Sequence, residues 1–137
     1  MIIISSRQNP FVQQCRDLAR RRDPRSGELL LDGMHLVSDA VAAGVPVSAA
    51  AATDAFWRSE SGDALARALE KAGAQLYAAS PAVIEAASPV KAPGGIVAVG
   101  RWQPAEPSRV FEAQPALVVC AVQVQDPGNV GAILRSA

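Results

Sequence analysis

The feature that most constrains the fold is a regular alternation between short apolar runs and longer amphipathic segments. The run at 28–32 precedes a stretch at 34–43 whose apolar residues recur at helical spacing, and Gly44 ends that stretch. The alternation continues, with strands predicted at 45–51, 75–78 and 96–99 and helices at 63–72 and 82–87. Strands separated by helical stretches of this length predict a parallel or mixed sheet covered by helices, the α/β class.

Prolines refine this pattern at two places. Pro46 confines its strand to a sheet edge or to a strand start, because proline cannot donate to the ladder. Asn9 and Pro10 predict a helix start, since asparagine can cap and proline favours the first helical position. This helix is predicted to run to about Arg22, before the turn-forming residues at 23–27.

Charge is unevenly distributed, although the formal net charge of the 137 residues is zero. Residues 1–25 contain six arginines and two aspartates, which leaves a net charge of +4 there and −4 in the remainder. An arginine-rich segment can be a phosphate-contacting surface or a solvated helix face. Composition leaves both interpretations open.

The chain length and apolar content bound the class of protein. The length suits one globular domain plus part of another. No apolar run approaches the ~20 residues that span a bilayer, and the start lacks a basic leader, so we expect a soluble protein without a signal peptide. Cys15 and Cys120 lack metal-binding spacing, and no metal site is predicted; reduced thiols in the cytoplasm are expected.

The last third of the chain changes character. Three prolines among polar residues at 101–115 predict a linker, and the apolar run at 116–122 predicts a strand buried on both faces. A turn at 125–129 then leads into a helix at 130–137. The free amides of such a unit could receive an anion. Equally, the turn residues, Asn129 as N-cap and Gly131 as a packing position could be purely structural.

Residues 125–137, QDPGNVGAILRSA, resemble the first signature motif of the SpoU (TrmH-like) RNA ribose 2′-O-methyltransferases of the SPOUT superfamily, D-P-x-N-x-G-x-x-x-R-S/T-A. Residues 27–40, GELLLDGMHLVSDA, resemble the substrate-binding-domain motif of that family, G-x-F/L-x-x-E/D-G-x-x-L-V-x-E/D-A. The start of the chain, with Ile4-Ser5-Ser6, Asn9-Pro10 and the arginine-rich helix, is also similar. Two separate motifs in the right order extend the resemblance over essentially the whole chain.

The resemblance implies an α/β/α substrate-binding domain similar to a small ribosomal protein, followed by the first strand–loop–helix of a trefoil-knot methyltransferase domain. The implied division is an N-terminal basic helix at 1–25, an RNA substrate-binding domain at 26–100, a linker at 101–115 and the start of the methyltransferase domain at 116–137. In the family, later motifs hold S-adenosylmethionine, so no cofactor-binding residue is assigned here. The implied activity is ribose methylation of rRNA or tRNA by a cytoplasmic homodimer, and 1–137 alone is expected to be inactive.

The resemblance also assigns site residues. Arg135 matches the essential arginine of the family, and Asn129 matches the asparagine at the edge of its active site. A guanidinium is a poor general base, so Arg135 is expected to hold the RNA phosphate and stabilise negative charge on the 2′-oxygen. The predicted RNA-binding residues are Arg7, Arg20, Arg21 and Arg22.

Other candidates carry less chemistry. His35, the single histidine, lies in the predicted RNA-binding domain and is interpreted as a surface or packing residue. Four aromatic side chains could stack on bases but are interpreted as packing residues: Phe56, Trp57, Tyr77 and Trp102. Two other functions stay open, a non-catalytic RNA-binding module of ribosomal-protein type and a nucleotide-binding protein using Gly128 and Gly131. The motif at 126–135 favours the enzyme.

Overall fold

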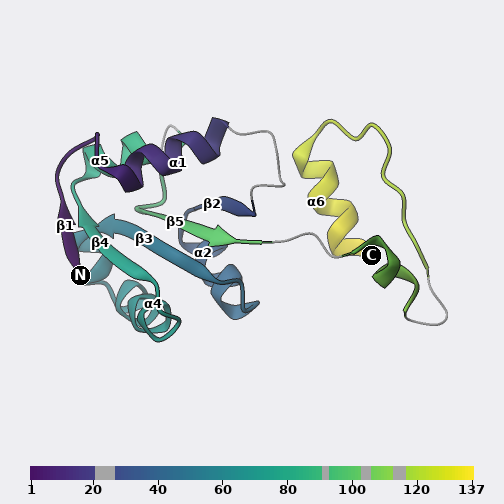
Figure 1. The fold of residues 1–137 in the computed structure, drawn as a ribbon, viewed down its shortest axis with the longest axis horizontal. Coiled ribbons are helices and arrows are strands. Elements are labelled where there is room, and N and C mark those ends of the chain that lie inside the picture. Colours follow the sequence, from purple (N-terminus) through teal and green to yellow (C-terminus); the bar gives the residue numbers. More distant parts are fainter. Residues whose placement is uncertain (21–26, 91–92, 103–105, 113–116) are drawn as a thin grey trace. The chain divides into compact units, whose positions relative to one another are not determined.

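The computed structural model describes residues 1–20, 27–90, 93–102, 106–112 and 117–137 (Figure 1). The chain folds into two compact units, Met1–Gln103 and Pro104–Ala137, and each is described by itself. Within the described residues, no helix is both long and apolar enough to cross a membrane.

The first unit is built on a mixed five-stranded sheet with the strand order β1-β4-β3-β5-β2. The strands are β1 (Ile2–Ile4), β2 (Glu28–Asp32), β3 (Val47–Thr53), β4 (Gln75–Ala79) and β5 (Ile96–Arg101). The pairs β1–β4 and β3–β4 are parallel, whereas β5 runs antiparallel to both β3 and β2. The predicted α/β class with a mixed sheet is therefore confirmed.

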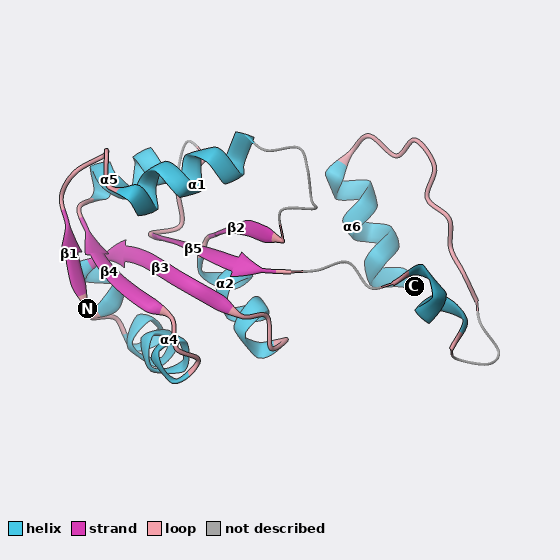
Figure 2. Cartoon of the chain, viewed as in Figure 1, coloured by secondary structure: helices cyan, strands magenta, loops and turns pink. Residues whose placement is uncertain are grey.

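Helices cover both faces of this sheet (Figure 2). One face carries α1 (Pro10–Arg20) and α5 (Pro81–Ala87), and the other carries α2 (Met34–Ala42), α3 (Asp54–Trp57) and α4 (Glu60–Lys71). Strand β5 supplies both cores, because Ile96 packs toward the α2–α4 side while Val97 packs toward the α1–α5 side. Strand periodicity thus produces a three-layer unit with two apolar cores.

Most predicted elements of the first unit are confirmed, but two short ones were missed. Neither β1, of three residues, nor α3, of four, is long enough to show a periodic pattern. Pro46 precedes β3, which lies at the centre of the sheet, so the strand-start interpretation is confirmed and the edge interpretation is wrong. Helix α1 begins at Pro10 as predicted and is described as far as Arg20.

The second unit contains a 3-10 helix, η2 (Pro107–Phe111), and one α-helix, α6 (Pro127–Ser136). The prediction of a buried strand at 116–122 is wrong, because 117–122 form no strand and all six residues are exposed. A strand requires a neighbour to satisfy its backbone groups, and the described residues of this unit contain no other strand. Residue 116 lies outside the described residues, as does part of the predicted linker.

The start of α6 also differs from the prediction. Asp126 is the N-cap, and its carboxylate Oδ1 accepts a hydrogen bond from the N–H of Asn129 at 2.9 Å. Pro127 then occupies the first turn, where its missing N–H costs nothing. Asn129 is therefore a helical residue, not the cap.

Candidate nucleic-acid interface

Helix α1 forms where the sequence places a cap, a proline and an apolar stripe. The Asn9 side chain accepts a hydrogen bond from the Phe11 N–H at 2.9 Å, which satisfies one of the free amides of the first turn. The buried face consists of Phe11, Val12, Cys15 and Leu18, packed into the core between α1, α5 and the sheet. Burial of this face leaves the polar face, with its arginines, toward solvent.

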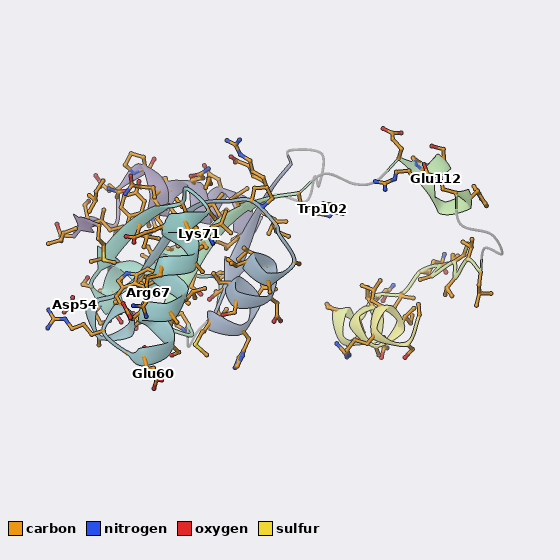
Figure 3. All side chains as sticks on the ribbon, turned by 90° about the horizontal axis from the view of Figure 1, so that it is seen from below. Asp54, Glu60, Arg67, Lys71, Trp102 and Glu112 are labelled. Carbon is orange, nitrogen blue, oxygen red and sulfur yellow. The ribbon has the colours of Figure 1, made fainter. Side chains whose placement is uncertain are left out.

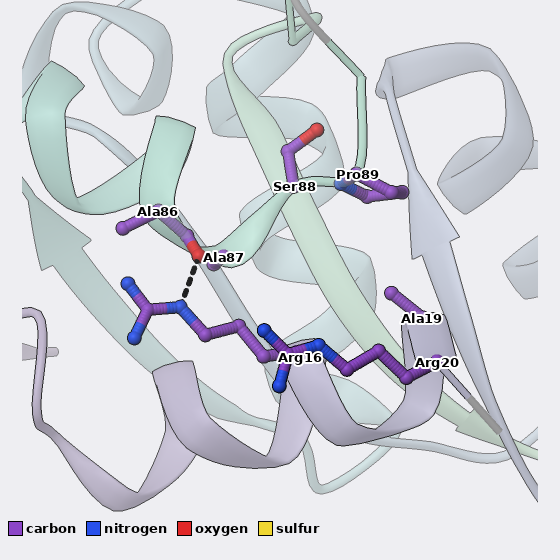
Figure 4. Close-up of a pocket in the computed structure, with 7 residues that line it drawn as sticks. All are labelled: Arg16, Ala19, Arg20, Ala86, Ala87, Ser88 and Pro89. Atoms are coloured by element: carbon purple, nitrogen blue, oxygen red, sulfur yellow. Dashed lines mark hydrogen bonds between the residues drawn. The ribbon is translucent and has the colours of Figure 1, made fainter.

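Two arginines of α1 line a hollow between α1 and α5, which we call the α1–α5 groove (Figure 4). Arg16 and Arg20 are four residues apart and so lie on the same face of the helix. The groove has a volume of about 320 Å³, and its far wall is the end of α5 with Ser88 and Pro89. The Arg16 Nε–H donates to the carbonyl oxygen of Ala86 at 2.8 Å. This bond ties the side chain to the last turn of α5.

The arginines of this region differ electrostatically from those on α3, α4 and η2, although Arg101 and Arg135 also have no salt bridge among the described residues. On α3, α4 and η2, arginines are paired with acids three or four residues away: Arg58 with Asp54, Arg67 with Asp63, and Arg109 with Glu112. Figure 3 shows this mixture of charges around α3 and α4. Among the residues that the structure describes, no salt bridge involves Arg7, Arg16 or Arg20. Their positive charge is therefore available to an external anion.

The acids near α1 are directed to other partners or to solvent. The Ser88 hydroxyl donates a short hydrogen bond to the Asp32 carboxylate. The Glu28 carboxylate accepts from the Gln14 amide at 3.3 Å. Asp17 of α1 and Glu85 of α5 are exposed. None of these four acids lines the α1–α5 groove.

The structure separates the predicted RNA-binding residues. Arg7 is exposed and precedes α1, whereas Arg20 ends it; a helix of this length spans about 16 Å at 1.5 Å per residue. Arg21 and Arg22 lie outside the described residues. Sequence reasoning missed Arg16, although its spacing of four from Arg20 was a usable signal.

The two predicted catalytic residues lie on α6 in the second unit, and both are exposed. They are six residues apart, which places them about 120° from one another around the helix. The Arg135 side chain folds back along α6, since a Cβ added to Gly131 would lie 3.2 Å from its Nη1 atom. Gly131 thus leaves room for the guanidinium beside the helix backbone, and the structure does not bring Asn129 to it.

The remaining sequence candidates have packing roles or stand alone. The Trp57 indole N–H donates to the Tyr77 carbonyl at 2.9 Å, and the Phe56 ring packs edge-on against it. His35 is exposed on α2. Burial, and secondarily the Asp32 carboxylate, raises the pKa of the Cys15 thiol to about 12, which excludes it as a nucleophile at neutral pH. In the described part of the chain, no three potential metal ligands cluster.

A second hollow, of about 600 Å³, lies at the carboxyl ends of β1, β3 and β4. Its walls are largely apolar and include Ile3, Ala78 and Pro81. The two charged groups in its wall, Asp54 and Arg58, pair with each other at 2.9 Å. This hollow therefore lacks the free positive charge that a polyanion requires.

A family model described as the MRM3-like substrate binding domain matches residues 9–98. An RNA 2′-O ribose methyltransferase structure is 26% identical with a TM-score of 0.74, covering 98% of this chain and 51% of that one. The SpoU methyltransferase AviRb from Streptomyces viridochromogenes, in complex with the cofactor AdoMet, is 25% identical with a TM-score of 0.62; coverage is 75% of this chain and 39% of that one.

An rRNA methyltransferase from Sinorhizobium meliloti shares the fold at 17% identity and a TM-score of 0.63, over 75% of this chain and 38% of that one. The chain thus spans about half or less of the length of these structures. No curated protein sequence matches it.

The bound AdoMet of one neighbour raises the question whether the second unit could hold that molecule. A small-molecule site is a concave pocket that encloses most of its ligand. None of the residues 117–137 is buried. These residues therefore do not form an S-adenosylmethionine site by themselves.

Proposed function

Because this chain belongs to the family of MRM3-like substrate-binding domains, we propose that its first unit binds RNA through the exposed face of α1. The observation that carries this proposal is that Arg7, Arg16 and Arg20, on α1 or just before it, form no salt bridge among the described residues of a protein whose formal net charge is zero. Free guanidinium groups on one helix face suit a phosphate backbone, where charge neutralisation dominates affinity. Arg7 and Arg20 belong to the proposed footprint, together with Arg21 and Arg22.

The proposed activity of the whole protein is methylation of a ribose 2′-hydroxyl in rRNA or tRNA, with S-adenosylmethionine as the methyl donor. The similarity to an RNA 2′-O ribose methyltransferase over 98% of this chain supports this assignment. In this proposal 1–25 is the N-terminal basic helix, which supplies the arginines, and 26–100 is the RNA substrate-binding domain. Residues 101–115 are the linker, and 116–137 begin the methyltransferase domain. The homodimer remains part of the proposal. The free state of Cys15 and Cys120 supports a cytoplasmic location.

Arg135 is the residue we assign to the chemistry. Its planar guanidinium holds the phosphate next to the target ribose and stabilises the negative charge that develops on the 2′-oxygen. It does not remove the proton, because a guanidinium is a poor general base. Asn129 is assigned to the edge of the same site. Its position about 120° around α6 from Arg135 fits contact with a different part of the substrate.

The experiment measures RNA affinity and methyl transfer separately. Reversing Arg20, Arg21 and Arg22 to glutamate should weaken RNA binding and flatten its salt dependence. Replacing Arg135 with alanine should abolish methyl transfer by the whole protein while the circular dichroism spectrum stays the same. Arg67→Glu, on α4, is the control for charge reversal. The proposal fails if the triple variant binds like the control across a salt series, or if Arg135→Ala turns over normally.

A further inference from the structure

We propose that the α1–α5 groove is a binding site for a single phosphodiester of the RNA, held jointly by Arg16 and Arg20. The inference rests on the proposed function and deepens it, since it assigns one phosphate to one place on α1. Arg16 is the residue that makes this place distinct from the rest of the helix.

The Arg16 guanidinium is preoriented. Its Nε–H is bound to the Ala86 carbonyl at 2.8 Å, and the residue is partly buried against α5. An arginine carries five N–H donors, so both terminal nitrogens remain free to donate. A side chain already held in one position loses less conformational entropy when it binds an anion. The Ala86 carbonyl thus acts as a support for the phosphate ligand.

Arg20 completes the site from the next turn of the same helix. Figure 4 shows its side chain running back along α1 toward Arg16 in the groove. Among the described residues it has no salt bridge and no side-chain hydrogen bond that competes for its guanidinium. Both side chains line one hollow, and arginine binds the oxygen atoms of a phosphate in bidentate geometry.

The walls of the groove admit an anion. Alanines at positions 19, 86 and 87 keep the hollow open, and the described residues that line it include no carboxylate. Ser88 lines the groove, but its hydroxyl points away from Arg16 and Arg20 (Figure 4), donates to Asp32 and accepts from the Val90 N–H at 3.0 Å. The Asp32 carboxylate is therefore held by Ser88, and it is not among the residues that line the space for the phosphate.

The test compares matched variants in RNA binding at several salt concentrations, measured by fluorescence anisotropy with a labelled rRNA stem–loop. Arg16→Gln and Arg20→Gln should each weaken binding about tenfold, as expected for loss of a charge-assisted hydrogen bond. The control, Arg67→Gln, removes the same charge from α4 and should leave affinity unchanged. Arg16→Lys should bind between the wild type and Arg16→Gln, because lysine keeps the charge but lacks the fork.

The double variant Arg16→Gln/Arg20→Gln shows whether the two arginines bind the same phosphate or two different ones. If both arginines hold the same phosphate, the losses in Arg16→Gln/Arg20→Gln are less than additive, and the salt slope falls by the value of one phosphate, about 0.7–0.9. Additive losses would overturn the shared site. Because Arg16→Gln also removes the bond to α5, thermal unfolding is measured for every variant. Arg20→Gln removes no hydrogen bond or salt bridge that the structure describes, so it tests the groove even if the Arg16 variants are unstable.

Inorganic phosphate alone separates a nucleic-acid site from a site for the free ion. Phosphate should compete with the stem–loop in the wild type and not in Arg20→Gln. If phosphate binds in the groove while RNA affinity is unchanged by it, the site serves free phosphate and the RNA assignment is overturned. If the wild type binds no RNA at all, the proposed function itself fails. If it binds RNA and both glutamine variants match Arg67→Gln, only the groove fails.

Discussion

Gly62 is the glycine of the first unit where an added methyl group should lower the free energy of unfolding most. It lies in the first turn of α4, directly after the short helix α3. A Cβ at this position would lie 1.9 Å from the Phe56 carbonyl oxygen and 2.9 Å from the Ser59 hydroxyl oxygen. The Gly62 N–H also donates to that hydroxyl at 3.0 Å, which is the N-cap bond of α4. Gly62→Ala therefore forces backbone atoms apart.

The expected cost follows from three contributions. Alanine is normally better than glycine inside a helix, by about 1 kcal/mol. Overpacking against atoms that cannot swing away costs about 1–3 kcal/mol, and loss of the N-cap bond costs about 1 kcal/mol more. The net result is a decrease of about 2 kcal/mol in the free energy of unfolding.

Urea denaturation followed by circular dichroism measures this change. The matched control is Ser61→Ala, one residue earlier on α4 and exposed, which should stay within about 0.5 kcal/mol of the wild type. A Gly62→Ala protein as stable as this control would refute the reasoning. It would mean that α3 can move away from α4 at no cost.

Two further predictions concern a buried thiol and a helical glycine. The folded pKa of Cys15, about 12, lies above the ordinary value of 9.0, so the stability that the neutral thiol contributes is complete below pH 9 and is lost as the pH rises toward 12. Cys15→Val should therefore flatten the dependence of the unfolding free energy on pH between 9 and 12. A variant with the same slope as the wild type would contradict this prediction. Gly131→Ala should strengthen α6 but displace the Arg135 guanidinium, lowering kcat of the whole enzyme more than its RNA affinity. An unchanged kcat would show that the position of this side chain along the helix is unimportant.

The elements that sequence patterns predicted are those whose evidence is local. The strand at Glu28–Asp32 and the helix at Met34–Ala42 each contain enough residues for a period to show. Strand β1 has three residues, and its partner on β4 lies about seventy-five residues later, with Ile3 opposite Ala78. No local pattern reveals such a pair. The prediction of a strand at 116–122 was wrong for the opposite reason: the local pattern was present, but no neighbouring strand is available among the described residues to pair with it.

The same distinction applies to the candidate site. Periodicity indicated which face of α1 is polar, and the arginine-rich composition indicated its charge. The bond from Arg16 to Ala86 joins residues seventy positions apart, so only the packing of α5 against α1 reveals it. The side-chain direction of Arg135 over Gly131 was likewise hidden, since two residues at helical spacing can meet or diverge.

The salt bridges within helices, however, could be predicted from the sequence. Arg58 and Arg67 each have an aspartate four residues earlier, the spacing at which helical side chains meet, and both form salt bridges. Arg16 has Val12 and Arg20 at that spacing, and Arg20 has Arg16 and Pro24. Arg20 has Asp17 three residues earlier, but among the described residues no salt bridge joins the two. The two arginines are therefore not neutralised by an acid of the described part of α1 and instead repel each other across one turn. Such a pair is stabilised by an anion between its members, which is why a protein of zero net charge can still present a phosphate site.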